Sequence, residues 1–254
     1  MKPLIQSLIL LCACCVLAVQ GPRPAQAQQP AKKKLRIVFF GAHCDDNETG
    51  AGGLMATLAK AGHEVISAYG TTYRGNRKIN DEPEDIVRRR ESTAACKILG
   101  ATPKFFDYAH ENLWADPPTL KTVSAWFEQV EPDIVVAHWP LDSHPNHHVV
   151  SSLTWLCYKP KGGWNLYFYE VLTDEQSLGF RAELYLDIEP VRDIKKKAIE
   201  CIKSQSDWNL WQSHEKMHCR RGAECGVEHA EAYFLVEAKP DCPLLPVQFL
   251  PKKN

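Results

Sequence analysis

The chain has 254 residues, of which 44% are hydrophobic, 24% charged and 9% aromatic. These proportions are those of a globular protein and exclude a disordered, collagen-like or coiled-coil chain. The 30 Lys and Arg residues nearly balance the 31 Asp and Glu residues, which gives a net charge of -1. Because no surplus of positive charge is available to hold a phosphate backbone, nucleic acid is not expected as a partner.

The N-terminal segment has the order of parts that is typical of a secretory signal peptide. Lys2 precedes an apolar run over 8–19, and the polar, Pro-rich sequence that follows ends in AQA (25–27). The small residues of an A-x-A site predict cleavage after this triplet, and the apolar run is short for a membrane span. We therefore expect a signal peptide over 1–27 and a secreted or periplasmic protein without a membrane span.

Removal of the signal peptide leaves a mature chain over 28–254 with a net charge of -3, long enough for one domain with a full core. A second interpretation takes LCAC (11–14) as a lipoprotein box with a lipid on Cys14. The mature chain keeps seven of the ten cysteines, and an odd number leaves at least one free thiol in an oxidising compartment. Cys219 and Cys225 are the pair that we most readily expect to be bridged.

From residue 35 onward, short β-branched or aromatic runs alternate with longer helical patterns. Strands are predicted over 35–41, 64–70, 104–108, 133–138, 165–171 and 182–188. Helices are predicted over 53–62, in a long segment ending in CKILG (96–100), over 120–130, and last over about 191–204. Apolar strands that alternate with helices indicate a mostly parallel sheet covered on both faces. We expect a single-domain α/β fold, a Rossmann-like three-layer sandwich.

Two predicted strands are followed by segments that are rich in chemically active side chains. AHCDDNETGAGG (42–53) follows the first strand, and WPLDSHPNHH (139–148) follows the strand over 133–138. Ligands of such sheets bind at the carboxyl ends of the strands, where these segments would meet. Imidazoles and carboxylates are the ligands of a catalytic zinc that keeps one coordination position open. The sequence therefore predicts a metal site at this edge.

Each group also has a simpler interpretation. Asp45 and Asp46 could serve only as an N-terminal cap and as charges that complement a helix dipole. His144 and His147 lie three residues apart, so on a helix their side chains would share one face. Two histidines can have this spacing by chance. The convergence of both segments on the same sheet edge favours the metal site.

The glycines of the first segment suggest a dinucleotide-binding loop as a competing interpretation. Gly50, Gly52 and Gly53 do not give G-x-G-x-x-G directly after the strand. The two carboxylates of Asp45 and Asp46 would also repel a pyrophosphate at that position. Nucleotide binding is therefore the weaker hypothesis.

The motifs resemble those of the PIG-L/LmbE family of zinc-dependent N-acetylglucosaminyl deacetylases. The family signature A-H-P-D-D, often continued as x-E-[IL]-G-x-G-G, is similar to AHCDDNETGAGG (42–53), and its later H-P-D-H is similar to HPNH (144–147). The family's R-x-x-E-x-x-x-A-x-x-L-G helix resembles the segment over 88–100. KKKA (195–198) and AEAY (230–233) also resemble family features, so the resemblance covers about residues 35–237.

The resemblance implies a role for each matching residue. It implies one Zn²⁺ per chain, with Fe²⁺ as the alternative metal, held by His43, Asp46 and His147. Asp45 would be the general base, and His144 would stabilise the oxyanion and help to protonate the leaving amine.

Two further residues are expected near the reacting groups. Asp142 would orient the ring of His144 without binding the metal itself. Arg88 would contact substrate hydroxyls or phosphate, and a surface salt bridge to Glu91 is an equally good interpretation of this arginine.

Three positions depart from the family pattern. Cys44 replaces the usual Pro and is expected to point into the fold as Pro would, although a thiol beside zinc could also ligate metal. Asn146 replaces the Asp of H-P-D-H, which removes a charge beside a histidine. Ile202 stands where many members have a His, so that contact is missing. None of the three is a predicted metal ligand.

The sequence thus predicts an exported metalloenzyme that hydrolyses the acetamide of an N-acetylglucosamine-like sugar, carried by a small molecule or a glycan. The alternative is a carbohydrate-binding protein of the same fold with little or no turnover. An enzyme needs the metal ligands and the base Asp45, whereas a binder can lose the base. All of these residues are present, which favours the enzyme.

Overall fold

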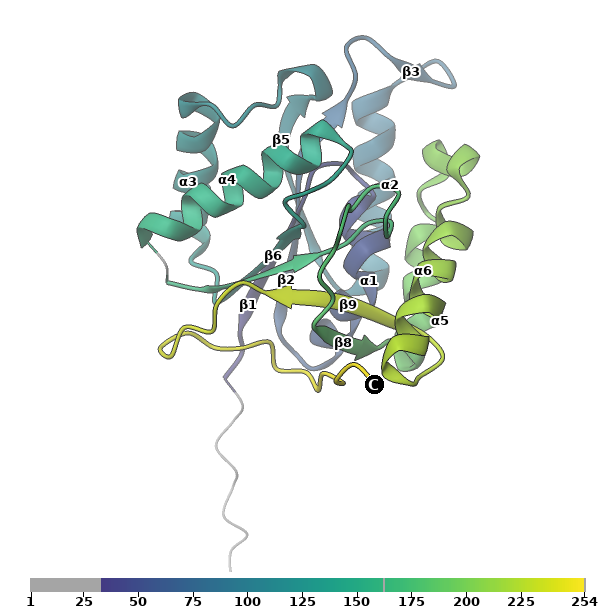
Figure 1. Ribbon diagram of the computed structural model, residues 1–254. Helices are drawn as coiled ribbons and strands as arrows, with labels where there is room; N and C mark the ends of the chain where they lie inside the picture. The colour runs from purple at the N-terminus through teal and green to yellow at the C-terminus, as the bar shows by residue number, and fades with distance from the viewer. Residues whose placement is uncertain (1–32, 162, 254) are drawn as a thin grey trace, which may run out of the picture. The chain divides into compact units, whose positions relative to one another are not determined.

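One seven-stranded sheet forms the centre of the fold, with the strand order β5-β2-β1-β6-β7-β9-β8 (Figure 1). The structure is a computed structural model that describes residues 33–161 and 163–253. The strands are β1 (Arg36–Gly41), β2 (Glu64–Tyr73), β5 (Thr102–Ala109), β6 (Ile134–His138), β7 (Asn165–Tyr169), β8 (Leu184–Asp187) and β9 (Ala230–Leu235). Neighbouring strands are parallel from β5 to β7, and β9 is antiparallel to both β7 and β8. The predicted mostly parallel sheet is confirmed.

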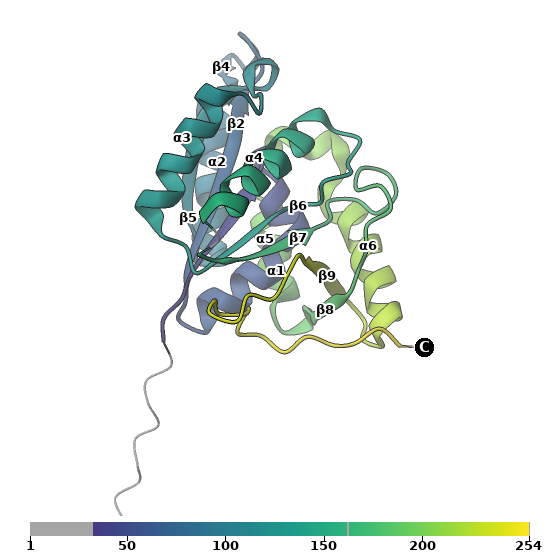
Figure 2. The same cartoon turned by 60° about the vertical axis from the view of Figure 1, so that its left-hand side comes forward.

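Helices cover both faces of this sheet, as Figures 1 and 2 show. The α-helices are α1 (Asp46–Lys60), α2 (Glu84–Leu99), α3 (Pro117–Val130), α4 (Pro145–Lys161), α5 (Arg192–Ile199) and α6 (Leu210–Cys225). Helices α3 and α4 lie on one face, and α1, α2, α5 and α6 lie on the other. Short elements complete the fold: the hairpin β3 (Lys78–Ile79) with β4 (Glu82–Pro83), and the 3-10 helices η1 (His110–Asn112), η2 (Glu189–Val191) and η3 (Lys203–Trp208).

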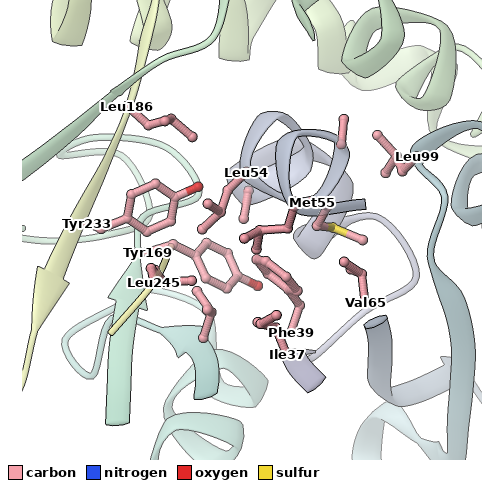
Figure 3. Packing of buried hydrophobic residues seen from close by; sticks show 14 of the residues in the cluster. Ile37, Phe39, Leu54, Met55, Val65, Leu99, Tyr169, Leu186, Tyr233 and Leu245 are labelled. Atoms are coloured by element: carbon pink, nitrogen blue, oxygen red, sulfur yellow. The ribbon is translucent and has the colours of Figure 1, made fainter. Parts of the chain in front are cut away.

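The alternation of side chains along β1 builds the two hydrophobic cores. Ile37 and Phe39 belong to the core that includes Leu54 of α1, shown in Figure 3. Val38 and Phe40 belong to the core on the opposite face, together with residues of α3 and α4. A strand that is buried on both faces is apolar throughout, which is the pattern that the sequence shows over 35–41.

Some predicted elements differ from those observed. The helix expected over 53–62 begins at Asp46, because glycines and polar residues hide the apolar pattern of its first turns. The helix expected last ends at Ile199, and α6 and β9 follow it. The sequence of α6 is polar with few apolar residues at helical spacing, which is why the periodicity did not indicate a helix there.

Two glycines of α1 allow this helix to lie directly on the sheet. A Cβ at Gly50 would stand 2.4 Å from the ring of Tyr169, and one at Gly53 would stand 2.5 Å from Ile188 and 2.8 Å from the Glu231 carboxylate. Real Cβ atoms do not approach other atoms so closely, since core packing leaves no room for the overlap. The glycine-rich segment therefore serves close helix packing, which accounts for it without a nucleotide.

A buried ion pair joins α5 to β9 behind α1. Lys195 Nζ lies 2.6 Å from the carboxylate of Glu231, and neither residue has more than 1% of its surface exposed. The same carboxylate accepts hydrogen bonds from the backbone N–H groups of Gly53 and Leu54 and from the Tyr233 hydroxyl. The two C-terminal segments that resemble family features thus meet in one cluster that holds α1 in place.

Replacement of Lys195 by Met is expected to lower the free energy of unfolding by about 3–5 kcal/mol, because it leaves the Glu231 carboxylate buried without a cation. Urea denaturation of the purified protein measures this change. The double variant Lys195→Met/Glu231→Gln serves as the control and should be less destabilised than the sum of the single variants. A loss below about 1 kcal/mol in the single variant would mean that the pair does not hold the fold.

The expected bridge between Cys219 and Cys225 is wrong, because both thiols are free. Both residues lie on α6, where six residues correspond to a rise of about 9 Å along the helix axis. Two cysteines so far apart on one rigid helix cannot reach the short Cβ separation of a disulfide.

The predicted signal peptide and the alternative lipid anchor at Cys14 lie outside the described residues. No helix in the described part of the chain has the length and apolar content to cross a bilayer.

Candidate metal centre

The candidate site lies where the connections from two adjacent strands leave the sheet in opposite directions. β1 pairs with β2 on one side and with β6 on the other. α1, which follows β1, lies on one face of the sheet, and α4, which follows β6, lies on the other. Such a switch point opens a crevice at the carboxyl ends of the strands. Both motif segments enter this crevice, as the sequence predicts.

Asn47 fixes the first turn of α1 to the strands β1, β2 and β7. Its side-chain NH₂ donates to the carbonyl oxygens of Phe39 and Ala68, at 3.3 and 3.0 Å, and to the hydroxyl of Ser67. Its carbonyl oxygen accepts from the Tyr169 hydroxyl at 3.0 Å. The residues just before and after Asn47 are thereby held at the edge of the sheet.

His43, Asp46 and His147 form a buried three-residue cluster at this edge. His43 Nδ1 lies 3.2 Å from His147 Nε2 and 3.2 Å from Asp46 Oδ2, and His147 Nε2 lies 3.3 Å from Asp46 Oδ1. A tetrahedral zinc with bonds of about 2.0–2.1 Å separates its ligand atoms by about 3.3–3.4 Å. The donor types and their spacing therefore fit one zinc-sized ion with room for a fourth ligand.

The charges of the cluster also fit a cation. Burial opposes a charge on His147, but the carboxylates of Asp46 and Asp142 outweigh it and raise the pKa of this imidazole to about 10. Despite burial, the imidazoles around Asp46 hold the pKa of its carboxyl well below its usual value. The ionised carboxylate therefore attracts a positive charge at this point, and a divalent ion would take the place of the proton on His147.

Asp142 and Asn146 contact the two imidazoles of the cluster. Asp142 Oδ1 lies 3.0 Å from His147 Nδ1, and it also accepts from the backbone N–H of His144 at 2.9 Å. The ring that Asp142 orients is thus that of His147 and not, as predicted from the sequence, that of His144. Asn146 Nδ2 lies 3.4 Å from His43 Nε2, so the residue that replaces the family Asp is in contact with a predicted metal ligand. Carboxylate and amide partners of this kind fix the ring orientation of metal ligands.

Asp45 lies next to the cluster and is paired with an arginine from α2. Its Oδ2 atom is 3.3 Å from Arg88 Nη1, and Arg88 is also 3.6 Å from Glu84. Burial raises the pKa of Asp45 to about 6, and the Arg88 guanidinium limits the rise. The predicted alternative for Arg88, a salt bridge to Glu91, is wrong, since Arg88 pairs with Asp45 and Glu84, and Glu91 accepts hydrogen bonds from Ser204. Arg88 is buried and supports the carboxylate that the sequence predicts to be the base.

His144 presents one ring nitrogen as a donor. Its Nδ1 atom accepts a hydrogen bond from the backbone N–H of Asn146 at 3.2 Å, so the proton of the neutral ring stands on Nε2. Burial lowers the pKa of His144, which keeps the ring neutral. Its ring centroid lies 4.4 Å from that of His43 and 4.8 Å from that of His147. His144 is therefore a hydrogen-bond donor beside the cluster. It also forms a second, less buried group with His43 and His110, whose ligand atoms lie within 4.8 Å of one another.

Two further histidines, not predicted from the sequence, lie beside the cluster. His138, the last residue of β6, accepts from the backbone N–H of Ala42 through Nε2 and stacks on the ring of His147 at 4.0 Å. His110, directly after β5, stacks on His43 at 4.4 Å. Both stand at the carboxyl end of a strand of the same sheet. Because ligands bind at these ends, that position could have indicated both histidines as site residues.

The remaining departures from the family pattern leave the cluster intact. The Cys44 side chain is buried and its thiol donates to the carbonyl oxygen of Thr71, so it points into the fold as expected. Burial raises the pKa of this thiol and keeps it protonated. Ile202 is also buried. Neither residue belongs to the candidate metal groups of the described chain.

The cluster opens into a cavity of about 460 Å³. Six predicted site residues line it: His43, Asp45, Asp46, Arg88, His144 and His147. Arg74, Glu175, Gln205 and His214 also lie on its walls. The cavity has the volume of a small-molecule binding site, and its polar groups converge on the cluster.

The α/β sheet thus carries a candidate His-Asp-His metal centre at its switch point. Residues 38–158 match the PIG-L family, described as GlcNAc-PI de-N-acetylase. The 4-oxalmesaconate hydratase of Pseudomonas putida is 30% identical over 205 residues, which cover 72% of this chain and 78% of that protein. The chain belongs to the PIG-L/LmbE family and is an enzyme of that family.

Its relatives carry two kinds of activity. The "Probable N-acetyl-alpha-D-glucosaminyl L-malate deacetylase 2" of Bacillus subtilis is 26% identical over 203 residues, 72% of this chain and 89% of that protein. The crystal structure of GalB, the 4-carboxy-2-hydroxymuconate hydratase of Pseudomonas putida, has a TM-score of 0.70 and 26% identity over 84% of this chain and 100% of that one. Deacetylases and hydratases thus share this fold.

Proposed function

We propose that this chain is an exported, zinc-dependent hydrolase that removes an acetyl group from the amide nitrogen of an N-acetylglucosamine-like sugar. One observation carries the proposal: Asp45 and His144 line the same cavity as the His43, Asp46 and His147 cluster. Amide hydrolysis needs a base for water and a donor for the oxygen on which negative charge develops. Export depends on the predicted signal peptide and is tested by the N-terminal sequence of the secreted protein.

Each residue then has a defined task in the reaction. A zinc ion on the cluster would lower the pKa of water toward about 7 and polarise the amide carbonyl. Asp45 accepts one proton from the attacking water, and Arg88 holds its carboxylate in position. His144 donates its Nε2–H to the amide oxygen without losing that proton. The proton that Asp45 has accepted passes to the leaving nitrogen, so that water and the amide give acetate and a primary amine.

Hydration of a carbon–carbon double bond is the second candidate, because a 30% identical relative is a hydratase. The same base would serve it, so the choice depends on the substrate that the cavity accepts. The carboxylated muconate for which the GalB hydratase is named carries several negative charges. The cavity offers two arginines, of which Arg88 is already paired with Asp45 and Glu84, and it adds the carboxylate of Glu175. This balance favours a neutral sugar over a polyanion.

Product analysis separates these candidates and the non-catalytic alternative. Proton NMR of the mature protein with N-acetylglucosamine or its oligomers should show free acetate and no new C–H signals from added water. Hydration of an unsaturated acid with no acetate from any sugar would support the hydratase. Sugar binding without turnover in the zinc-loaded protein would support the carbohydrate-binding alternative.

His144→Ala is expected to lower kcat for acetate release by about 100-fold to 1,000-fold, the usual effect of losing one oxyanion donor. Its zinc content should not change, because the ring of His144 lies outside the ligand cluster. His144→Gln, which keeps a donor group, serves as the comparison and should lose less activity. A wild-type rate in the Ala variant would remove His144 from the reaction.

A further inference from the structure

A second cavity of about 390 Å³ adjoins the metal-centre cavity. The two cavities share two wall residues, Arg74 and His144. The ring of His144 packs against that of His43 on one side and also lines the second cavity. The second cavity therefore lies beside the metal-centre cavity, next to His144 and Arg74.

An exposed indole stands at the edge of the second cavity. Trp114 has 62% of its surface exposed, the highest value among the large hydrophobic side chains of the described residues, and it follows the buried Leu113. Leu113, Pro145 and Val149 add apolar surface to the same wall. A large aromatic group left in solvent beside an apolar wall is suited to stack on a ligand ring.

The polar groups of the second cavity carry opposite charges. Arg74 lies on its wall, and its guanidinium forms no ion pair with another described residue. Glu111 lies on the same wall, and its Oε1 atom is 3.5 Å from the position of a Cβ on Gly75, the residue next to Arg74. A carboxylate or phosphate in this cavity would meet the charge of Glu111 as well as that of Arg74. Hydroxyl groups can accept from an arginine and donate to a glutamate at the same time.

We propose that the second cavity is a subsite for a neutral sugar ring linked to the ring that is deacetylated, so that the substrate is a disaccharide or a longer glycan. A pyranose has an apolar face for the indole of Trp114 and hydroxyl groups at its edge for Arg74 and Glu111. This inference rests on the proposed deacetylase function and names the substrate class of that same site. It makes Trp114 a residue that sets substrate length without touching the reacting atoms.

The test compares kcat/KM for acetate release from N-acetylglucosamine and from N,N'-diacetylchitobiose. The wild type should favour the disaccharide by about tenfold or more, which corresponds to 1.4 kcal/mol of additional binding to the transition state. Trp114→Ala should remove this preference and leave the rate on the monosaccharide unchanged, while Trp114→Phe should keep most of it. Trp155→Ala, which removes an exposed indole on α4 outside both cavities, is the matched control and should behave as the wild type.

Each outcome decides a different part of the inference. Equal kcat/KM values for both sugars in the wild type would overturn the subsite and leave the deacetylase function standing. An equal loss on both sugars in Trp114→Ala would also overturn it, because the tryptophan would then support the site as a whole. Acetate release from neither sugar by the zinc-loaded wild type would overturn the proposed function, and the subsite with it.

Discussion

Asp45→Asn is expected to lower kcat for acetate release by about 100-fold to 10,000-fold, the usual contribution of a general base. The amide keeps the size of the carboxylate but cannot accept the proton of water. Asp45 lies in the cavity beside the cluster, and among the described residues its ion pair is with Arg88. Zinc content should therefore remain that of the wild type, as measured by elemental analysis of the same samples used for kinetics.

The neighbouring carboxylate provides the matched control for this experiment. Asp46→Asn makes the same chemical change one residue away, but Asp46 lies 3.2 and 3.3 Å from the nitrogens of His43 and His147. This variant should lose metal together with activity. Normal turnover in Asp45→Asn, or loss of metal from it, would contradict the division of tasks between the two adjacent aspartates.

His147→Ala is expected to weaken zinc binding by more than about 100-fold, because loss of a direct ligand should exceed the 10-fold to 100-fold effect of losing a supporting partner. His147 supplies one of the three donor atoms of the cluster and is itself held by Asp142. Competition with a chromogenic chelator measures the affinity. Activity should fall in parallel and return only in part when zinc is added in excess.

His148→Ala is the control for this loss of metal. His148 is the next residue of α4, and its ring contacts the carbonyl oxygen of Asp142 rather than the cluster. This variant should keep its zinc. Stoichiometric zinc retained by His147→Ala after dialysis would show that the ligand set is different from the one described.

The sheet and most of its strands could be predicted because each strand is a short apolar run bounded by polar or glycine residues. The same argument placed both motif segments at one edge of the sheet, where the structure has them. α6 and the start of α1 could not be predicted from periodicity. Their burial depends on tertiary contacts, such as those of Gly50 with Tyr169 and of Lys195 with His218, and not on a continuous apolar stripe.

Within the site, the sequence could predict which side chains converge but not how they contact one another. Asp142 and Arg88 were both predicted near the site, yet their partners differ from those expected. A hydrogen bond such as that between Asp142 and the His147 ring depends on side-chain directions at the start of α4, which residue spacing does not give. His110 and His138 were missed because each stands alone in the sequence, without a motif around it. The second cavity likewise arises from loops after different strands.

The most direct test of a metal-dependent amide hydrolase is the release of primary amine from N,N'-diacetylchitobiose by the mature protein in three states. These states are the protein as purified with its metal content measured, the protein after chelation, and the chelated protein with one equivalent of zinc. The account predicts about one zinc per chain, amine release that chelation abolishes, and recovery on adding zinc. Amine release that persists in the metal-free protein, or a purified protein that neither contains nor binds zinc, would contradict it.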